Sequence, residues 1–208
     1  MLYTQTVEPH TFSILRKLQT IPELDNFYLV GGTALSLLYG HRISVDLDLF
    51  SFQPFDNQLI IDTLKNEFGQ NFTTEDKPSR FGIFGFVERV KVDIVRFPHP
   101  LIKPVIEVDG IRMFSIEDIV AMKVQAVLGR GKKKDFWDIA ELLQHFSVSD
   151  FIQFHKQKYA TQNLLITVPQ AITFFADAEE SIDPISLKNQ TWESVKQTIG
   201  EKVSAYLL

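Results

Sequence analysis

Two aspartates, Asp46 and Asp48, stand one residue apart in the stretch HRISVDLDLF, residues 41–50. Apolar and polar residues alternate from 44 to 52, which predicts a strand on which both carboxylates point to the same face. Carboxylates held so close repel each other or share a proton unless a cation lies between them. A divalent ion with oxygen ligands, such as Mg²⁺, resolves this conflict, although a D-x-D pair alone fits an exposed polar strand equally well.

A third acid, Asp93, lies in the middle of another apolar strand pattern, VKVDIV. Taken alone, Asp93 either caps a turn or pairs with Lys91 or Arg96. On a strand next to the first pair it would complete a site for two metal ions about 3.5–4 Å apart. The sequence therefore predicts Asp46, Asp48 and Asp93 as metal ligands, with two Mg²⁺ ions expected and Mn²⁺ as the alternative.

Gly31, Gly32 and Thr33 form a glycine turn between a predicted strand and a predicted helix in LVGGTALSLLYG. Glycine lets backbone N–H groups approach a phosphate, the helix N-terminus adds positive potential, and the Thr33 hydroxyl can donate a further hydrogen bond. The spacing is neither that of a P-loop nor that of a dinucleotide fingerprint. A G-G-T sequence alone more often marks an ordinary strand-to-helix turn, so its meaning depends on the acids that follow.

A second group of charged residues lies in MKVQAVLGRGKKKDFWDIAELL. Lys123 and Arg130 are seven residues apart, close to two helical turns, and Asp135 and Asp138 are three apart, so each pair shares a helix face. Lys123 interrupts an apolar run, where a lysine either reaches the surface along its stem or binds an anion. The cationic run 132–134 fits either phosphate contacts or a solvated turn.

Composition limits the class of protein. The 208 residues are 45% hydrophobic and 23% charged, typical of a globular chain, and 18 phenylalanines predict an aromatic-rich core. The lack of cysteine excludes disulfides, thiolate metal sites and cysteine nucleophiles, and neither G-x-S-x-G nor H-E-x-x-H is present. Without a long apolar run or a signal-peptide pattern, we expect a cytoplasmic protein with no membrane contact. The net charge of −5 predicts no general attraction for nucleic acid, but it permits a local basic patch.

The elements that position these residues predict an α+β fold. Strand patterns and a hairpin around Asp109-Gly110 dominate residues 1–114, and helical patterns dominate residues 115–208, with Ser115 as a helix cap. We therefore expect a mixed β-sheet flanked by helices, followed by a helical C-terminal part packed on it. Strands are predicted near 26–30, 44–52, 72–76, 81–87, 89–97 and 105–115. Helices are predicted near 8–19, 33–40, 57–68, 116–130, 132–146, 149–159, 169–178 and 191–207.

The order of these motifs resembles the nucleotidyltransferase superfamily related to DNA polymerase beta: G-G-T, a helix, D-x-D on the next strand, then a single acid. More narrowly, GGTALSLLYGHRISVDLDLF together with EDIVAMKVQAVLGRGKKKDFWDIAELL resembles the AbiEii/AbiGii nucleotidyltransferase toxin family. The resemblance implies metal-dependent transfer of a nucleoside monophosphate from an NTP to a hydroxyl. It also implies the toxin of a toxin–antitoxin or abortive-infection system, with a cognate antitoxin and with tRNA 3′ ends as the acceptor in some relatives.

Two alternatives stay open beside this interpretation. One is a small-molecule nucleotidyltransferase of the antibiotic-modifying type, because related folds modify aminoglycosides and proteins. The other is a catalytically inactive module that binds a nucleotide or a partner. The presence of all three expected acids disfavours the inactive module.

The resemblance also implies roles for single residues. Asp46 and Asp48 would hold both metal ions, and Asp93 would bind the metal that activates the attacking hydroxyl. The glycine turn 31–33 would hold the β- and γ-phosphates.

Basic residues would complete the site. Lys123 would contact the triphosphate with support from Arg130 and Lys134, and either Asp135 or Asp138 would orient these basic groups. Two residues match the family's R-x-S-x-D-x-D spacing and are counted as substrate-binding, namely Arg42 and Ser44. Arg42 would either neutralise a phosphate or hold the strand through the acids of that strand. No role is assigned to the histidines, and Phe136 and Trp137 are expected to pack between helices.

Overall fold

The computed structural model describes residues 1–74 and 79–208. Its strands are β1 (Tyr28–Leu29), β2 (Leu47–Ser51), β3 (Phe72–Thr74), β4 (Gly82–Val87), β5 (Val90–Arg96), β6 (Ile106–Val108) and β7 (Ile111–Met113). Its helices are α1 (Pro9–Gln19), α2 (Gly31–Tyr39), α3 (Asn57–Phe68), α4 (Ile116–Gly129), α5 (Lys133–Leu142), α6 (Val148–Lys158), α7 (Val168–Ile172) and α8 (Trp192–Leu207). Short 3-10 helices are Thr4–Thr6, Pro22–Leu24, Gly69–Asn71 and Ala176–Ala178.

The strands form one mixed sheet in the order β3-β4-β5-β2-β1-β7-β6. β2 pairs in parallel with β5, β1 pairs in parallel with β7, and the other pairings are antiparallel. In the β2–β5 register Asp48 is the direct partner of Asp93. The predicted α+β fold with a mixed sheet is confirmed.

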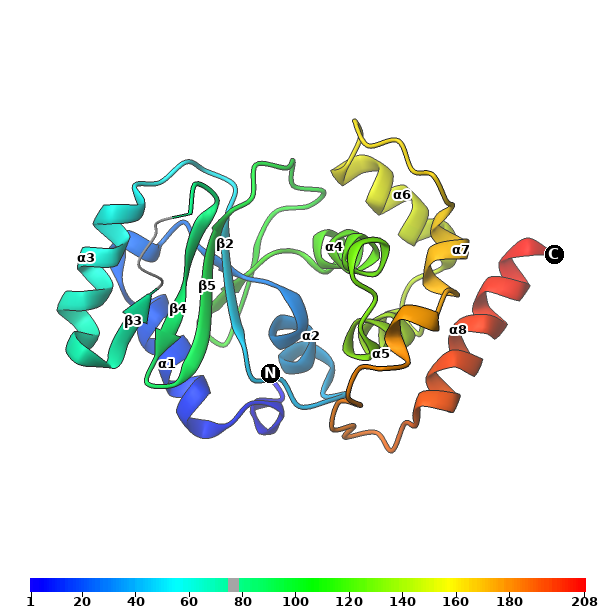
Figure 1. The fold of residues 1–208 in the computed structure, drawn as a ribbon, viewed down its shortest axis with the longest axis horizontal. Helices are drawn as coiled ribbons and strands as arrows, with labels where there is room; N and C mark the ends of the chain where they lie inside the picture. The colour runs from blue at the N-terminus through cyan, green and yellow to red at the C-terminus, as the bar shows by residue number, and fades with distance from the viewer. Residues whose placement is uncertain (75–78) are drawn as a thin grey trace.

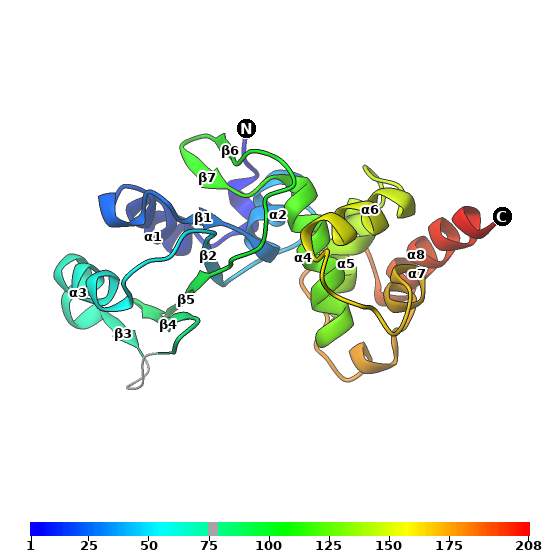
Figure 2. The same cartoon turned by 90° about the horizontal axis from the view of Figure 1, so that it is seen from above.

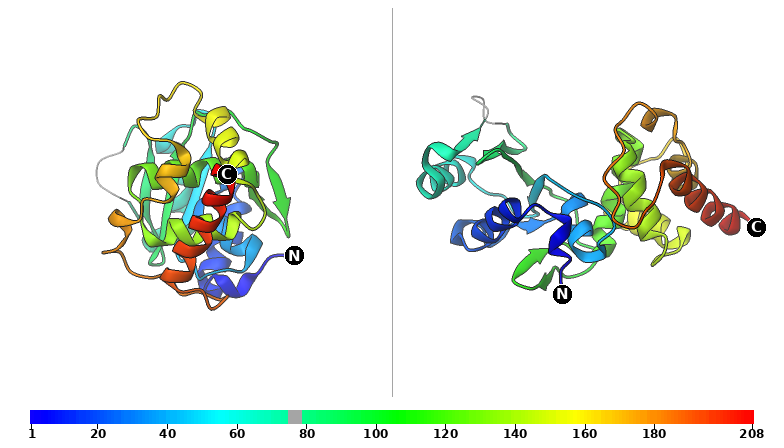
Figure 3. Two further views of the ribbon diagram at one scale, coloured as in Figure 1. Left: turned by 90° about the vertical axis from the view of Figure 1, so that its right-hand side faces the viewer. Right: turned by 90° about the horizontal axis from the view of Figure 1, so that it is seen from below.

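Helices cover the sheet unevenly. α1 and α3 lie on one side of it, while α2 and α4 lie on the other side, next to β1 and β2 (Figures 1 and 2). The last strand ends at Met113. The regular elements that follow it are helices, α4 to α8 with one 3-10 helix, joined by loops. Figure 3 shows the sheet with α3 at one end of the molecule and α8 at the other. No helix among the described residues is long and apolar enough to cross a membrane.

Local sequence signals explain several element ends. The Ser115 hydroxyl accepts from the Asp118 N–H and starts α4, as predicted. Asp109 and Gly110 both have positive φ in the β6–β7 hairpin turn. Between the C-terminal helices, the buried Trp137 ring stacks on Trp192 with centroids 5.8 Å apart, and Phe136 is fully buried beside it. The expected packing role of these aromatic residues is confirmed.

Three predicted elements differ from the structure. The strand expected from 44 begins at Leu47, because the main chain before it has other partners: the Ile43 N–H donates to the Ile185 carbonyl, and the Ser44 N–H to that of Thr6. The pattern at 169–178 forms α7 and then a 3-10 helix rather than one continuous helix. β3 ends at Thr74, and the remainder of the strand expected at 72–76 lies outside the described residues.

Candidate active site

The three predicted metal ligands lie at the middle of the sheet. Asp48 and Asp93 are cross-strand neighbours on β2 and β5 and project from the same face. Asp46 precedes β2 in an irregular segment. Burial raises the pKa of Asp48, and the charge of Asp93 raises it further, while Lys123 and Lys91 act in the opposite direction. The site therefore concentrates negative charge at a poorly hydrated position.

Two lysines balance part of this charge. Lys91 forms an ion pair with Oδ2 of Asp93, and the Lys134 amine lies 3.4 Å from Oδ2 of Asp46. The other carboxylate oxygen of Asp93, Oδ1, is buried and has no hydrogen-bond partner. An unpartnered buried carboxylate oxygen beside a second, partly buried carboxylate has the chemistry of a site for a hard cation.

These residues thus fit a divalent metal ion by donor type. Among the described residues, however, no three carboxylate or imidazole side chains are arranged around one cation position. Lys91 and Lys134 take up one oxygen each of the outer two acids. An ion bound between the acids would therefore compete with both lysines.

The two glycines of the turn lie against charged side chains. A Cβ on Gly31 would come within 2.8 Å of Oδ2 of Asp48, and one on Gly32 within 2.1 Å of an Arg42 guanidinium nitrogen. Gly31 also has φ +71°, which L side chains rarely adopt. The close approach of Asp48 and Arg42 therefore requires glycine here, independently of any phosphate.

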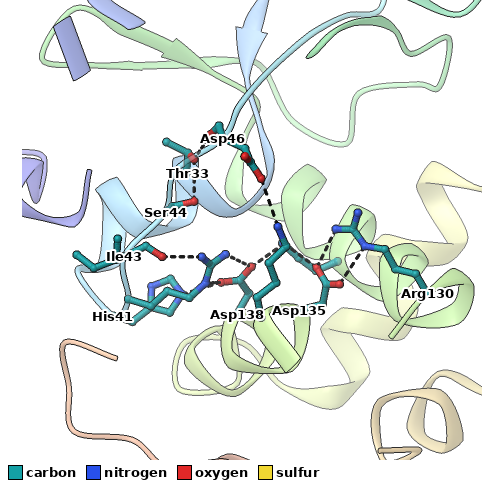
Figure 4. A network of polar contacts seen from close by, with 11 residues as sticks. Thr33, His41, Ile43, Ser44, Asp46, Arg130, Asp135 and Asp138 are labelled. Carbon is teal, nitrogen blue, oxygen red and sulfur yellow. Dashed lines mark hydrogen bonds and ion pairs between the residues drawn. The ribbon is translucent and has the colours of Figure 1, made fainter. Parts of the chain in front are cut away.

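Thr33 connects the turn to the segment before β2. Its buried hydroxyl donates to the main-chain carbonyl of Asp46, and it accepts a 2.8 Å hydrogen bond from the Ser44 hydroxyl (Figure 4). A hydroxyl has one proton. The side chain of Thr33 therefore fixes the position of Asp46 rather than donating to a ligand as expected.

Asp138 on α5 is the centre of a buried ionic cluster. One of its oxygens, Oδ1, lies 2.8 Å from His41 Nε2 and 2.7 Å from Arg42 Nε, and the other lies 2.9 Å from Arg42 Nη2 (Figure 4). Lys123 on α4 adds a 2.6 Å contact to that second oxygen. Burial alone raises the pKa of Asp138, but the charges of Arg42 and Lys123 outweigh it and hold the pKa well below its usual value.

Asp135 extends the same cluster toward the surface. Its Oδ1 lies 3.1 Å from the Lys123 amine, and the Arg130 guanidinium donates to both of its oxygens at 3.1 and 3.2 Å. Burial lowers the pKa of Lys123, but Asp138 and Asp135 outweigh that effect and raise it, so Lys123 stays charged. Arg130 differs from the other members because its side chain is 53% exposed.

Comparisons with known proteins identify the family of this chain. Residues 13–206 match the model of the family described as "Nucleotidyl transferase AbiEii toxin, Type IV TA system". The chain belongs to the AbiEii family. It is therefore a nucleotidyltransferase of a toxin family, and the resemblance inferred from its motifs is confirmed. Because the members of this family are toxins of type IV toxin–antitoxin systems, membership implies an NTP substrate and a cognate antitoxin.

Individual relatives extend this finding. An uncharacterised protein from Aquifex aeolicus is 30% identical over 203 residues, covering 93% of this chain and 94% of that protein. Two solved structures share the fold at low identity. JHP933 from Helicobacter pylori has a TM-score of 0.58 at 18% identity, covering 96% of this chain and 92% of that one. The nucleotidyltransferase toxin MenT4 from Mycobacterium tuberculosis has a TM-score of 0.59 at 11% identity, covering 95% and 85%.

The fold of this AbiEii protein places the predicted site residues in two groups. Asp46, Asp48 and Asp93 lie together with Lys134 and the turn at Gly31. Thr33 and Ser44 hold the segment that carries Asp46. The other predicted residues form or adjoin the buried cluster, namely Gly32, Arg42, Lys123, Arg130, Asp135 and Asp138. Arg42 contacts an acid, but that acid is Asp138 on α5 rather than one of the expected acids of the strand. The sequence left open whether Asp135 or Asp138 orients the basic groups. In the structure both acids contact Lys123.

His41 is the member of the cluster that sequence reasoning missed. It is fully buried and contacts Asp138 through Nε2. A search for histidine metal motifs cannot find such a residue, because His41 contacts an acid almost a hundred positions away in the sequence. Its place directly before Arg42, in the segment that leads to the two acids, was the available signal.

Proposed function

We propose that this AbiEii protein moves a nucleoside monophosphate from an NTP to a hydroxyl of an RNA acceptor, such as a tRNA 3′ end, and releases pyrophosphate. The observation that carries the proposal is the placement of Asp48. It is the cross-strand partner of Asp93, it lies against Gly31 at the start of α2, and it is two residues from Asp46. Carboxylates beside a helix N-terminus suit a substrate that carries phosphates and a counter-ion together.

We propose Asp46, Asp48 and Asp93 as the residues that would hold divalent metal, two Mg²⁺ ions by preference. Bound there, such ions polarise phosphoryl oxygens and lower the pKa of an attacking hydroxyl. The chain itself contributes the backbone N–H groups at the start of α2, which can bind phosphate oxygens. Lys134 and Lys91, once displaced from Asp46 and Asp93, become free to pair with phosphates.

The buried cluster has a different role in this proposal. Lys123 is held between Asp135 and Asp138 and stays charged, so it adds positive potential near Asp48 without leaving its partners. Arg130, with its exposed side chain, can reach a phosphate while Asp135 orients it. Arg42 and Ser44 act by fixing the segment before β2 rather than by touching the nucleotide. A cytoplasmic location stays a prediction.

A transfer assay tests the proposal. The purified protein is incubated with each labelled NTP, total RNA and Mg²⁺, and the label in RNA is measured. Asp48→Asn keeps the shape of the side chain and removes a charge that burial and Asp93 both disfavour, so the variant should fold normally. We expect it to lose transfer, whereas unchanged labelling by Asp48→Asn would refute the proposal.

A further inference from the structure

The face of the sheet that carries Asp48 and Asp93 continues into a pair of phenylalanines. On β4, Phe84 is the direct cross-strand partner of Asp93, and Phe86 is the partner of Lys91. Directly paired residues of antiparallel strands project to the same face. The two rings and the lysine therefore lie in the same layer as the proposed metal ligands.

This face is open where the opposite face is filled. The alternate residues of β4 and β5, such as Ile83, Val87 and Ile94, are buried. α1 and α3 lie on that filled side (Figure 2). Phe86 is 47% exposed, and Phe84 and Asp93 are partly exposed. Two neighbouring aromatic side chains on the open face of a sheet, beside a charged site, form an exposed apolar patch of the kind that marks a contact surface.

The two sides of Asp48 differ in chemistry. β1, Gly31 and the start of α2 lie on one side of β2, where Lys134 and Arg130 add positive charge. β5 and β4 lie on the other side, where the open face presents aromatic rings and one lysine. A triphosphate suits the first side, because it needs N–H groups and cations. The second side is left for the molecule that receives the nucleotide.

We propose that Phe84 and Phe86 form a stacking platform for unpaired bases at the end of a nucleic acid acceptor, with Lys91 available for its backbone phosphate. Aromatic side chains on an open sheet face, interspersed with basic residues, bind single strands by base stacking. Asp93 would then lie beside the last sugar of the bound nucleic acid. The inference rests on the proposed transferase function and identifies where its acceptor binds.

The surface beyond Phe86 can accommodate a longer strand. A depression of about 990 Å³ adjoins this residue at the β4–β5 turn. Gln70, Asn71, Thr73 and Arg89 line part of it, and Glu8 and His10 at the start of α1 line another part. Amide and guanidinium groups donate hydrogen bonds to base edges and phosphates. Glu88, which also lines the depression, is paired with His10 at 3.0 Å. A strand of several nucleotides could thus extend from Asp93 across both rings.

Binding of a labelled RNA tests the platform without turnover. The probe is a fluorescein-labelled, unstructured ten-nucleotide RNA, measured by anisotropy with the full chain in EDTA and without NTP. Phe86→Ala and Phe84→Ala should each raise Kd by about 5- to 150-fold, the range for loss of one stacked base. Phe86→Trp keeps a ring and should bind like the wild type, whereas Phe86→Leu should not. The matched control is Phe174→Ala, which removes a 55% exposed ring from the helical part and should leave Kd unchanged.

The outcomes separate this inference from the transferase function. The platform is refuted if wild type fails to bind the RNA, if it prefers the same RNA annealed to its complement, or if Phe84→Ala and Phe86→Ala bind normally. It is also refuted if the wild type transfers nucleotide to a small molecule or a protein and not to RNA, and in that case the transferase function stands. If Asp48→Asn still transfers nucleotide, the proposed function fails, while the binding data still decide the platform. NTP-induced thermal stabilisation should be equal in wild type and Phe86→Ala.

Discussion

Two groups of charged side chains lie next to each other in this protein and differ in how completely they are paired. In the cluster around Asp138, both carboxylate oxygens contact cations, and Asp135 is held by Lys123 and Arg130. In the group around Asp48, Asp93 keeps a buried oxygen without a partner, and burial raises the pKa of Asp48. The carboxylates of the first cluster are thus saturated, which indicates a structural role even though Nδ1 of His41 has no partner, whereas incomplete pairing of partly buried acids leaves capacity for a ligand.

Replacing the centre of the saturated cluster should give the largest effect on stability. Asp138→Asn leaves Arg42 and Lys123 buried without the charge that both contact, which costs about 3–5 kcal/mol when a buried ion pair is broken. We expect urea denaturation to show this loss, and Asp48→Asn to show none. Equal stability of Asp138→Asn and wild type would mean that the cluster is dispensable for folding.

A second comparison concerns two buried lysines. Lys123 contacts two carboxylates, whereas Lys158 contacts one, Asp118 at 2.6 Å, and also donates to the Pro100 carbonyl at 3.1 Å. Burial lowers the pKa of Lys158 despite these partners. Lys123→Met should cost about 3 kcal/mol, as for a broken buried pair.

Lys158→Met should cost about 1 kcal/mol, since Asp118 keeps hydrogen bonds from Ser115 and from two backbone N–H groups. Chemical denaturation of both variants measures the difference. A larger loss for Lys158→Met would contradict the ranking by number of carboxylate partners.

Acid should weaken the saturated cluster. The pKa of Asp138 lies well below its usual value in the folded protein, so the unfolded chain binds the proton more readily as the pH falls. The stability that Asp138 contributes is complete above about pH 4, the unfolded pKa, and is lost as the pH falls toward the lower folded pKa. Denaturation midpoints between pH 6 and pH 2.5 should therefore fall less steeply for Asp138→Asn than for the wild type. Parallel curves would show that Asp138 does not carry this dependence.

The smallest effect on folding is expected at Lys134. Its pair with Asp46 is partly exposed and long, at 3.4 Å, and such pairs contribute about 0–1 kcal/mol. Lys134→Ala should therefore keep the thermal midpoint of the wild type and reduce nucleotide transfer. Lys133→Ala is the matched control, because the neighbouring lysine pairs with Asp183 instead. Similar losses of transfer in both variants would argue against a specific role for Lys134.

The sequence was sufficient to predict much of this molecule for physical reasons. Asp93 and the pair at 46 and 48 interrupt apolar strand patterns, and such acids are conspicuous because they oppose burial. The caps and turns at Ser115 and Asp109-Gly110 are local signals, so the elements they bound were predicted correctly. The mixed sheet followed from the order of these elements.

Other features depend on contacts that sequence spacing does not encode. His41 and Arg42 meet Asp138 across 97 and 96 positions, so their shared role as its partners required the packing of α5 against the segment before β2. The Thr33 hydroxyl was expected to face a phosphate, but the irregular course of residues 43–46 brings the Asp46 carbonyl to it. The open face with Phe84 and Phe86 also became visible only once the register of β4 on β5 was known.

The most direct test of the central claim is whether nucleotide binding requires both a divalent metal and Asp48. Thermal unfolding is followed with each NTP in Mg²⁺ and in EDTA, for the wild type and Asp48→Asn. We predict that one or more NTPs stabilise the wild type in Mg²⁺, by about 2.7 kcal/mol at one hundred times Kd. We also predict that EDTA or Asp48→Asn removes this increment. Equal stabilisation in EDTA, or full metal-dependent stabilisation of Asp48→Asn, would contradict the assignment of the Asp46, Asp48 and Asp93 group as the nucleotide and metal site.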